Sequence, residues 1–198
     1  MYDCSMMAEH LDQLPMTFSY REARDQGVSK RQLYRWRDEG AIELLGRGLY
    51  RRADALLADT DLIEVAHRAP EATLCLTSAL VRHGLSDAIP ASHDVAVPRG
   101  RRTPAVSIPV TWHRFDPGTF EIGRKIIALD DQTAIGLYDA TRSLVDVLRL
   151  APQYGPETAY EALRRWLRGG GAPADLLEVA EHFPRTLPRL RTALDVLL

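Results

Sequence analysis

The chain has 198 residues, enough for one large domain or two small ones. A hydrophobic content of 45% and a charged content of 26% are ordinary for a globular protein, and the formal net charge of −2 gives no global signature of nucleic-acid binding. The two cysteines, Cys4 and Cys75, lack the paired spacing of a disulfide framework or a zinc site. No apolar run approaches the ~20 residues that span a bilayer, and the polar N-terminus excludes a signal peptide, so we expect a cytoplasmic protein.

Two helix-capping patterns mark the region around residue 30. Ser19 with Glu22, and Ser29 with Gln32, each place a capping hydroxyl three residues before a Glu or Gln. They predict helices over residues 20–26 and 30–39, separated by a glycine that can close the first helix with a positive φ. This arrangement is typical of a helix-turn-helix.

Flanking segments complete a winged helix. A helix is expected over residues 5–14, where Met7, Leu11 and Leu14 share one stripe. After the helix-turn-helix, apolar strands on either side of Gly46-Arg47-Gly48 predict a two-stranded wing. The winged helix-turn-helix should end near Ala53.

The second helix of the pair has two distinct faces. Leu33 and Trp36, with Val28, should form a small core beneath it, while its opposite face is basic. Arg can bind guanine edges and Lys can bind phosphate in the major groove. The segment Ser19–Arg52 contains nine basic and five acidic residues. The residues expected to bind DNA are Ser29, Lys30, Arg31, Tyr34, Arg35 and Arg47. The alternative is an amphipathic helix pair whose basic face is only solvated.

The remainder of the chain predicts an α+β domain with a small sheet and C-terminal helices. The alternation across residues 106–114 predicts a strand that Pro109 confines to a sheet edge. Other strands are expected at 95–97, 120–123, 125–129 and 134–137, and helices at 62–69, 78–83, 157–168, 175–183 and 187–198, with a further helical stretch from Asp139. We expect a DNA-binding domain over residues 1–53 and an α+β partner-binding domain over 54–198, with a mixed part at 54–150 and a helical tail at 151–198.

Four stretches, taken together and in order, resemble the AbiEi-type antitoxins of bacterial toxin–antitoxin systems. They read GVSKRQLYRWRDEGAIELLGRGLYRR, LTSALVRHGL, AIPASHDVAVPRGRR and TRSLVDVLR. The resemblance covers nearly the whole chain. It implies an N-terminal domain that binds operator DNA and represses its own operon, and a second domain that counteracts a cognate nucleotidyltransferase-like toxin, either by holding it or without contact.

Two features of the second domain are candidates for toxin binding. Arg99, Arg101 and Arg102 form a basic turn that could also be a second contact to phosphate or only a solvated hairpin. Trp166 and Phe183 are aromatic side chains of the kind that anchor protein interfaces, although core aromatics have the same sequence pattern. We expect direct contact with the toxin through this domain.

An enzyme is disfavoured because no catalytic constellation converges. His93 and Asp94 are strand neighbours and should point to opposite faces, and His113 is expected to be exposed. Asp130-Asp131 reads as a solvated turn, and Arg142 with Asp146 as a helix pair. We therefore expect no catalytic activity, no cofactor and no metal. The alternative function is a stand-alone winged-helix transcription regulator whose second domain senses a ligand.

Overall fold

The chain folds as two compact units in a computed structural model that describes residues 10–55 and 59–197. The N-terminal unit comprises Met1–Pro70, Pro104–Ile108 and Ala128–Ala134, and the second unit comprises Glu71–Thr103, Pro109–Ile127 and Ile135–Leu198. Helices and strands are mixed in both, which confirms the α+β class. The division at residue 53, which concerns domains that fold on their own, stays a prediction.

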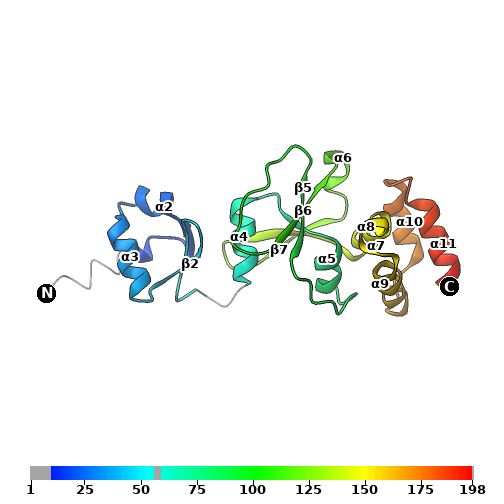
Figure 1. Ribbon diagram of the computed structural model, residues 1–198, viewed down its shortest axis with the longest axis horizontal. Coiled ribbons are helices and arrows are strands. Elements are labelled where there is room, and N and C mark those ends of the chain that lie inside the picture. Colours follow the sequence, from blue (N-terminus) through cyan, green and yellow to red (C-terminus); the bar gives the residue numbers. More distant parts are fainter. Residues whose placement is uncertain (1–9, 56–58, 198) are drawn as a thin grey trace. The chain divides into compact units, whose positions relative to one another are not determined.

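The N-terminal unit contains a winged helix-turn-helix with one strand more than the sequence predicted. Its elements are β1 (Thr17–Ser19), α2 (Tyr20–Asp25), α3 (Lys30–Asp38), β2 (Ile42–Gly46), β3 (Leu49–Arg52) and α4 (Thr60–Arg68), and Figure 1 shows α2, α3 and β2 in blue and cyan. β1 makes the wing a three-stranded sheet of order β1-β3-β2. Phe18 pairs with Tyr50 across β1 and β3, and their rings stack at 5.9 Å. Of the helix predicted at 5–14, residues 10–12 are helical, and Met7 lies outside the described residues.

Both predicted caps form, one of them completely. The Ser19 hydroxyl accepts from Glu22 N–H at 3.2 Å, and the Glu22 carboxylate accepts from Ser19 N–H at 2.7 Å. Burial alone would raise the pKa of Glu22, but the hydrogen bonds from Ser19 outweigh it and lower that pKa. The Ser29 hydroxyl accepts from Gln32 N–H at 3.2 Å, which is the first half of a capping box. Between the helices Gly27 has a φ of +81°, a conformation that favours glycine.

The hydrophobic core of the winged helix lies beneath α3. Leu33 and Trp36 are 0% and 1% exposed and pack with Val28 and Phe18, as the two-faced pattern predicted. Leu14 joins the same cluster from the N-terminal side. Because α3 is anchored through these residues, its opposite face is held outward in one orientation.

A five-stranded mixed sheet, of order β6-β5-β4-β8-β7, forms the centre of the second unit. Its strands are β4 (Thr73–Leu74), β5 (His93–Pro98), β6 (Val110–Phe115), β7 (Arg124–Ala128) and β8 (Ala134–Tyr138). β6 lies at an edge, as expected, but it begins after Pro109, so the strand predicted across 106–108 is absent there. A proline cannot donate to a ladder, and a strand can begin after it. The strand predicted at 120–123 is also wrong, since Phe120 ends the short helix α6 (Pro117–Phe120).

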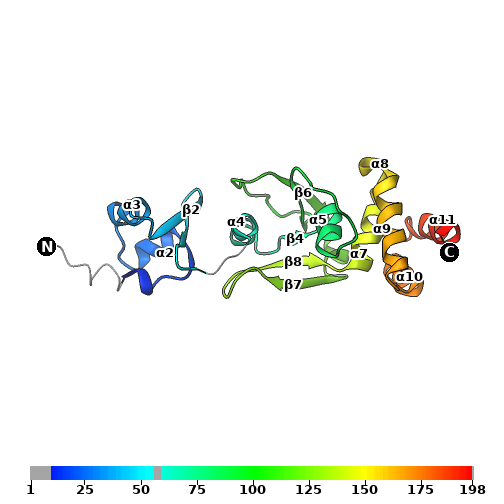
Figure 2. The same ribbon diagram turned by 90° about the horizontal axis from the view of Figure 1, so that it is seen from below.

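The helices of the second unit gather around α7. Besides α6, they are α5 (Leu76–Arg82), α7 (Ala140–Arg149), α8 (Ala151–Tyr154), α9 (Pro156–Arg168), α10 (Pro173–Glu181) and α11 (Leu187–Leu197). α7 contacts α5, α9, α10 and α11, and Figures 1 and 2 show it between α5 and the C-terminal helices. Buried side chains of α9, α10 and α11 share one core with those of α5 and α7. Residues 156–197 therefore contribute to the core of this unit.

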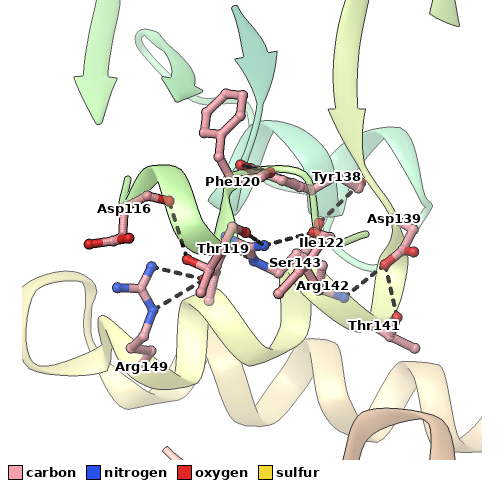
Figure 3. Close-up of polar contacts among 11 residues, drawn as sticks. Asp116, Thr119, Phe120, Ile122, Tyr138, Asp139, Thr141, Arg142, Ser143 and Arg149 are labelled. Atoms are coloured by element: carbon pink, nitrogen blue, oxygen red, sulfur yellow. Dashed lines mark hydrogen bonds and ion pairs between the residues drawn. The ribbon is translucent and has the colours of Figure 1, made fainter. Parts of the chain in front are cut away.

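A fully buried arginine lies at the centre of that core. Arg142 donates through Nε to Asp146 at 2.8 Å and through Nη1 to the carbonyls of Thr119 and Ile122 at 2.6 and 2.7 Å (Figure 3). Its guanidinium lies 4.3 Å from the ring centre of Tyr138. The predicted helix pair with Asp146 thus exists, and both side chains are 0% exposed.

No helix among residues 10–55 and 59–197 is long and apolar enough to cross a bilayer.

Candidate nucleic-acid interface

The outer face of α3 presents the residues that the sequence singled out. Lys30, Arg31, Tyr34 and Arg35 are all exposed, directly opposite the buried Leu33 and Trp36. Ser29 immediately precedes them as the N-cap of α3. The helix therefore offers cations and its positive N-terminal end on the same side, which suits contact with phosphate and with base edges.

Tyr34 lies between two cations on this face. Lys30 Nζ is 5.5 Å and the Arg37 guanidinium is 5.1 Å from the centre of its ring, and Tyr34 is 41% exposed. Arg37 was not among the predicted DNA-binding residues. Its spacing of three from Tyr34 on a helix predicts this contact, and its guanidinium also pairs with Asp38 at 2.9 Å.

Some cations of the face are free of carboxylates. In the described part of the chain, no ion pair involves Lys30, Arg31 or Arg47. Arg35 has only a long contact of 4.0 Å with Glu39, between two half-exposed side chains. Exposed pairs of this kind contribute little to stability, so these side chains are available to a polyanion.

Two of the arginines counted in residues 19–52 are buried. Arg51 is buried and bonds Asp130 at 2.6 Å, and Arg52 is buried against Asp12 and Asp54 at 2.8 and 2.7 Å. The hydrogen bond from Arg52 lowers the pKa of Asp54. All three carboxylates lie outside residues 19–52, so they offset two of the positive charges counted there. The exposed positive charge of the interface comes from α3 and the wing tip.

The finding at Asp130 corrects its predicted role as part of a solvated turn. Besides Arg51, its carboxylate accepts from the N–H groups of Gln132 and Thr133. Burial would raise the pKa of Asp130, but the hydrogen bond from Arg51 and those from the turn lower it. Asp130 is thus a buried partner of the wing strand β3 within the N-terminal unit.

The backbone of the wing tip is held by a hydrogen bond, while the side chain of Arg47 is exposed. The carbonyl of Arg47 accepts from Arg68 at 2.8 Å, and Arg68 also bonds the buried Glu64 at 2.8 Å. A side chain at position 46 would collide with the Glu64 carboxylate, which explains the glycine there. Arg47 therefore extends from a fixed support, as a contact to phosphate or the minor groove requires.

The predicted toxin-binding turn is exposed and forms two ion pairs. Arg101 bonds Glu71 at 2.6 Å, Arg99 lies 3.6 Å from Asp116, and Arg102 is exposed. These residues follow β5 as the basic turn that the sequence predicted. Their partner role stays a prediction.

The two aromatic candidates pack within the second unit. Phe183 is 9% exposed in the core, and the guanidinium of Arg142 lies 4.7 Å from its ring centre. Trp166 is half-buried against the same core and lies directly over Gly171, where a β-carbon would collide with its ring. Both positions favour the alternative that these aromatics stabilise the chain's own core.

One histidine prediction is wrong. His113 is only 10% exposed in its side chain, and its Nε2 lies 2.8 Å from Asp94 Oδ1. β5 and β6 pair in parallel with His113 beside Ala96, so Asp94 is a diagonal neighbour on the same face. The sequence could show that His93 and Asp94 diverge, but not which strand lies next to Asp94.

Comparisons with known proteins bear on both units. Residues 6–53 match the family described as "Transcriptional regulator, AbiEi antitoxin". The resemblance to AbiEi antitoxins is confirmed in this region. The match supports a regulatory antitoxin role, and the family is described as a regulator and not as an enzyme.

The fold of the whole chain has a solved counterpart. It is similar to the crystal structure of the RV2827C protein from Mycobacterium tuberculosis, with a TM-score of 0.60, 15% sequence identity, and coverage of 96% of this chain and 75% of that one. At this identity the likeness concerns the fold alone. A search of the curated proteins finds no match.

Proposed function

We propose that this chain is an antitoxin that represses its own operon through α3 and the wing, and that its second unit neutralises a cognate nucleotidyltransferase-like toxin by direct contact. The observation that carries the DNA-binding half is the face of α3. Its exposed cations, Lys30 and Arg31, engage in no ion pair within the described residues, and they project from a helix fixed by the buried Trp36. This face lies within the region that matches the regulator family.

The roles on the DNA follow from the geometry of each residue. Arg31 and Arg35, one helical turn apart, are the candidates for bidentate bonds to guanine in the major groove. Lys30 and the N-terminal N–H groups of α3 suit phosphate. Arg47 on the wing reaches the neighbouring backbone or minor groove.

The decisive experiment for this half measures binding to duplex DNA from the region upstream of the gene. Fluorescence anisotropy should show that the double variant R31A/R35A loses affinity, by about 1–3 kcal/mol for each residue that reads a base. The matched control is R21A/R24A, which removes two exposed arginines from α2, both paired to Asp25. Equal losses in the two double variants would show that only overall charge matters, and would contradict base readout by α3.

The toxin half rests on the family match and on the exposed basic turn Arg99–Arg102. Co-expression with the product of the adjacent gene should yield a complex that co-purifies, and R101A/R102A should weaken that complex without affecting operator binding. Point variants are required because the helices after Gly155 form part of the core of the second unit, so their removal would unfold it. Rescue from toxicity without co-purification would replace direct contact by a non-contact mode.

A further inference from the structure

The second unit contains a cavity of about 530 Å³ whose charged lining is almost entirely basic. It opens where the end of β6, the start of α6, the end of α7 and the segment between α10 and α11 come together. Five arginines and one carboxylate line it, in a chain whose net charge is −2. The charged lining residues are Arg99, Arg114, Arg149, Arg185, Arg189 and Asp116.

The carboxylates nearby do not balance these cations. Asp116 lies 3.6 Å from Arg99, and Asp146, just behind the lining, is shared by Arg149 and the buried Arg142. Figure 3 shows Arg142 and Arg149 on the same helix, near Thr119 and Asp116. Over the described ranges, no ion pair involves the other three arginines, which are Arg114, Arg185 and Arg189. These three side chains are exposed, so water and salt screen their mutual repulsion, but they remain available to a bound anion.

A buried hydroxyl in the cavity wall is also without a partner. Thr186 is 1% exposed and lines the cavity, and its Oγ1 makes no hydrogen bond to any described residue. Leaving a buried hydroxyl unpaired is costly, so such groups are rare in folded proteins and indicate an absent partner. Among the described residues, Nη2 of Arg142 is the other buried side-chain atom in this condition, and its neighbour Nη1 bonds the carbonyl of Thr119, a lining residue.

The same place is the start of a helix. Thr186 immediately precedes α11, an 11-residue helix, and Arg185 and Arg189 flank its first turn. The first backbone N–H groups of a helix have no partner within it and carry partial positive charge, which favours oxyanions. In α11 these donors are the N–H groups of Leu187 and Arg189, because Pro188 has none. The arginines, the unpaired hydroxyl of Thr186 and the start of α11 therefore all favour the same kind of ligand, an oxyanion.

We propose that this cavity binds a small ligand that carries a di- or triphosphate group. A single phosphate would engage only part of the basic lining, whereas a di- or triphosphate carries about three to four negative charges and can accept bidentate bonds from several guanidinium groups. The cavity volume is in the range of small-molecule sites, about 300–1,000 Å³. A DNA backbone lying across the surface would leave the buried hydroxyl of Thr186 unpaired. The site lies wholly in the second unit and does not depend on the proposed operator binding.

The test is isothermal titration calorimetry of the full-length protein with pyrophosphate, inorganic phosphate and ATP. We expect saturable binding of one pyrophosphate per chain, tighter than that of inorganic phosphate. The variant R185A/R189A should weaken it by about tenfold or more. The matched control, R164A/R168A, also removes two exposed arginines four residues apart, but from α9 outside this cavity, and should bind like the original protein.

Comparing the affinities for the three compounds shows whether the ligand is a nucleotide or the polyphosphate group alone. Tighter binding of ATP than of pyrophosphate identifies a nucleotide, and equal binding identifies the polyphosphate group alone. The proposal is overturned if none of the three compounds binds at low salt, or if both double variants bind pyrophosphate equally. It is also overturned if R185A/R189A changes only the affinity for duplex DNA, since the arginines would then contact a DNA backbone.

Two conservative variants test the position of the ligand. Thr186→Val removes the unpaired hydroxyl at nearly constant volume, so thermal unfolding without ligand should be unchanged or shifted upward while pyrophosphate affinity falls. Asp116→Asn keeps an oxygen to cap α6, where Asp116 accepts from Gly118 N–H, but removes the one lining carboxylate, so affinity should rise. Unchanged pyrophosphate affinity in both variants would overturn this placement.

Discussion

Helices α3 and α7 both contain arginines, and the two helices use them in opposite ways. On α3 in the N-terminal unit the cations lie in solvent above a buried apolar face. On α7 in the second unit Arg142 is fully buried and bonds one carboxylate and two backbone carbonyls. Burial decides the difference: arginines on α3 pair with carboxylates only at the surface, whereas a buried charge is tolerated only when it is paired and hydrogen-bonded. Arginine content alone therefore does not identify a nucleic-acid surface.

The largest effect should come from breaking the buried arrangement on α7. Arg142→Met leaves Asp146 with only one arginine and leaves the carbonyls of Thr119 and Ile122 without their donor. We expect the free energy of unfolding to fall by about 3–5 kcal/mol in urea denaturation. Replacing Asp146 by Leu in the same protein should restore part of the loss, because the fully buried carboxylate that has lost its buried partner is then also removed. Native stability of the single variant would contradict the role assigned to Arg142.

On α3 the buried residue is apolar, and its removal should have a comparable effect. Trp36→Ala opens a cavity beneath the helix and should lower the free energy of unfolding of the N-terminal unit by ~3–5 kcal/mol. Trp112→Ala, at a half-buried position on the edge strand β6, is the control and should cost less. A Trp36→Ala protein with native melting but without DNA binding would instead place the indole at the DNA.

The ion pair Arg51–Asp130 should make the stability of the N-terminal unit depend on pH. The pKa of Asp130 is lowered in the folded state, so the pair stabilises the fold above the unfolded-state value of about 3.9 and loses that contribution as pH falls through the lower folded pKa. Asp130→Asn should cost about 3 kcal/mol near neutral pH. Urea unfolding of both proteins from about pH 7 down to about pH 3 should show the difference between them shrinking on the acid side. A constant difference would contradict the linkage.

These cases show which parts of the structure the sequence could predict. The caps of α2 and α3, the two faces of α3 and the glycine turn depend on residues three or four positions apart, and their geometry was predicted. The partner of Arg51 is 79 residues away, and the partner of His113 lies across a parallel strand pair, so neither follows from local pattern. β1 has only three residues, and its existence depends on pairing with β3. The buried hydroxyl of Thr186 likewise becomes evident only when the packing around it is known.

A smaller effect, the salt dependence of DNA affinity, should distinguish the exposed cations that bind phosphate from those that read bases. Each phosphate contact releases counterions, so the affinity of the original protein for operator DNA should fall steeply as salt rises. Lys30→Ala should lower the magnitude of the slope of log K against log salt by about one, with similar losses on operator and unrelated DNA. Arg31→Ala should instead lower the affinity for the operator more than the affinity for unrelated DNA. Identical behaviour of the two variants would show that α3 binds without reading sequence.

The smallest effect concerns Ser29, which both caps α3 and stands among the predicted DNA contacts. Its hydroxyl accepts from Gln32 N–H, so Ser29→Ala should cost about 1 kcal/mol of stability through the lost cap. Ser29→Asn retains a capping oxygen and should leave thermal unfolding nearly unchanged. If Ser29 acts only as a cap, the Asn variant should bind operator DNA like the original protein, and the Ala variant should lose affinity only to the extent that the first turn of α3 frays. A loss of affinity in both variants, with the Asn variant fully stable, would instead identify a direct contact from this hydroxyl to phosphate.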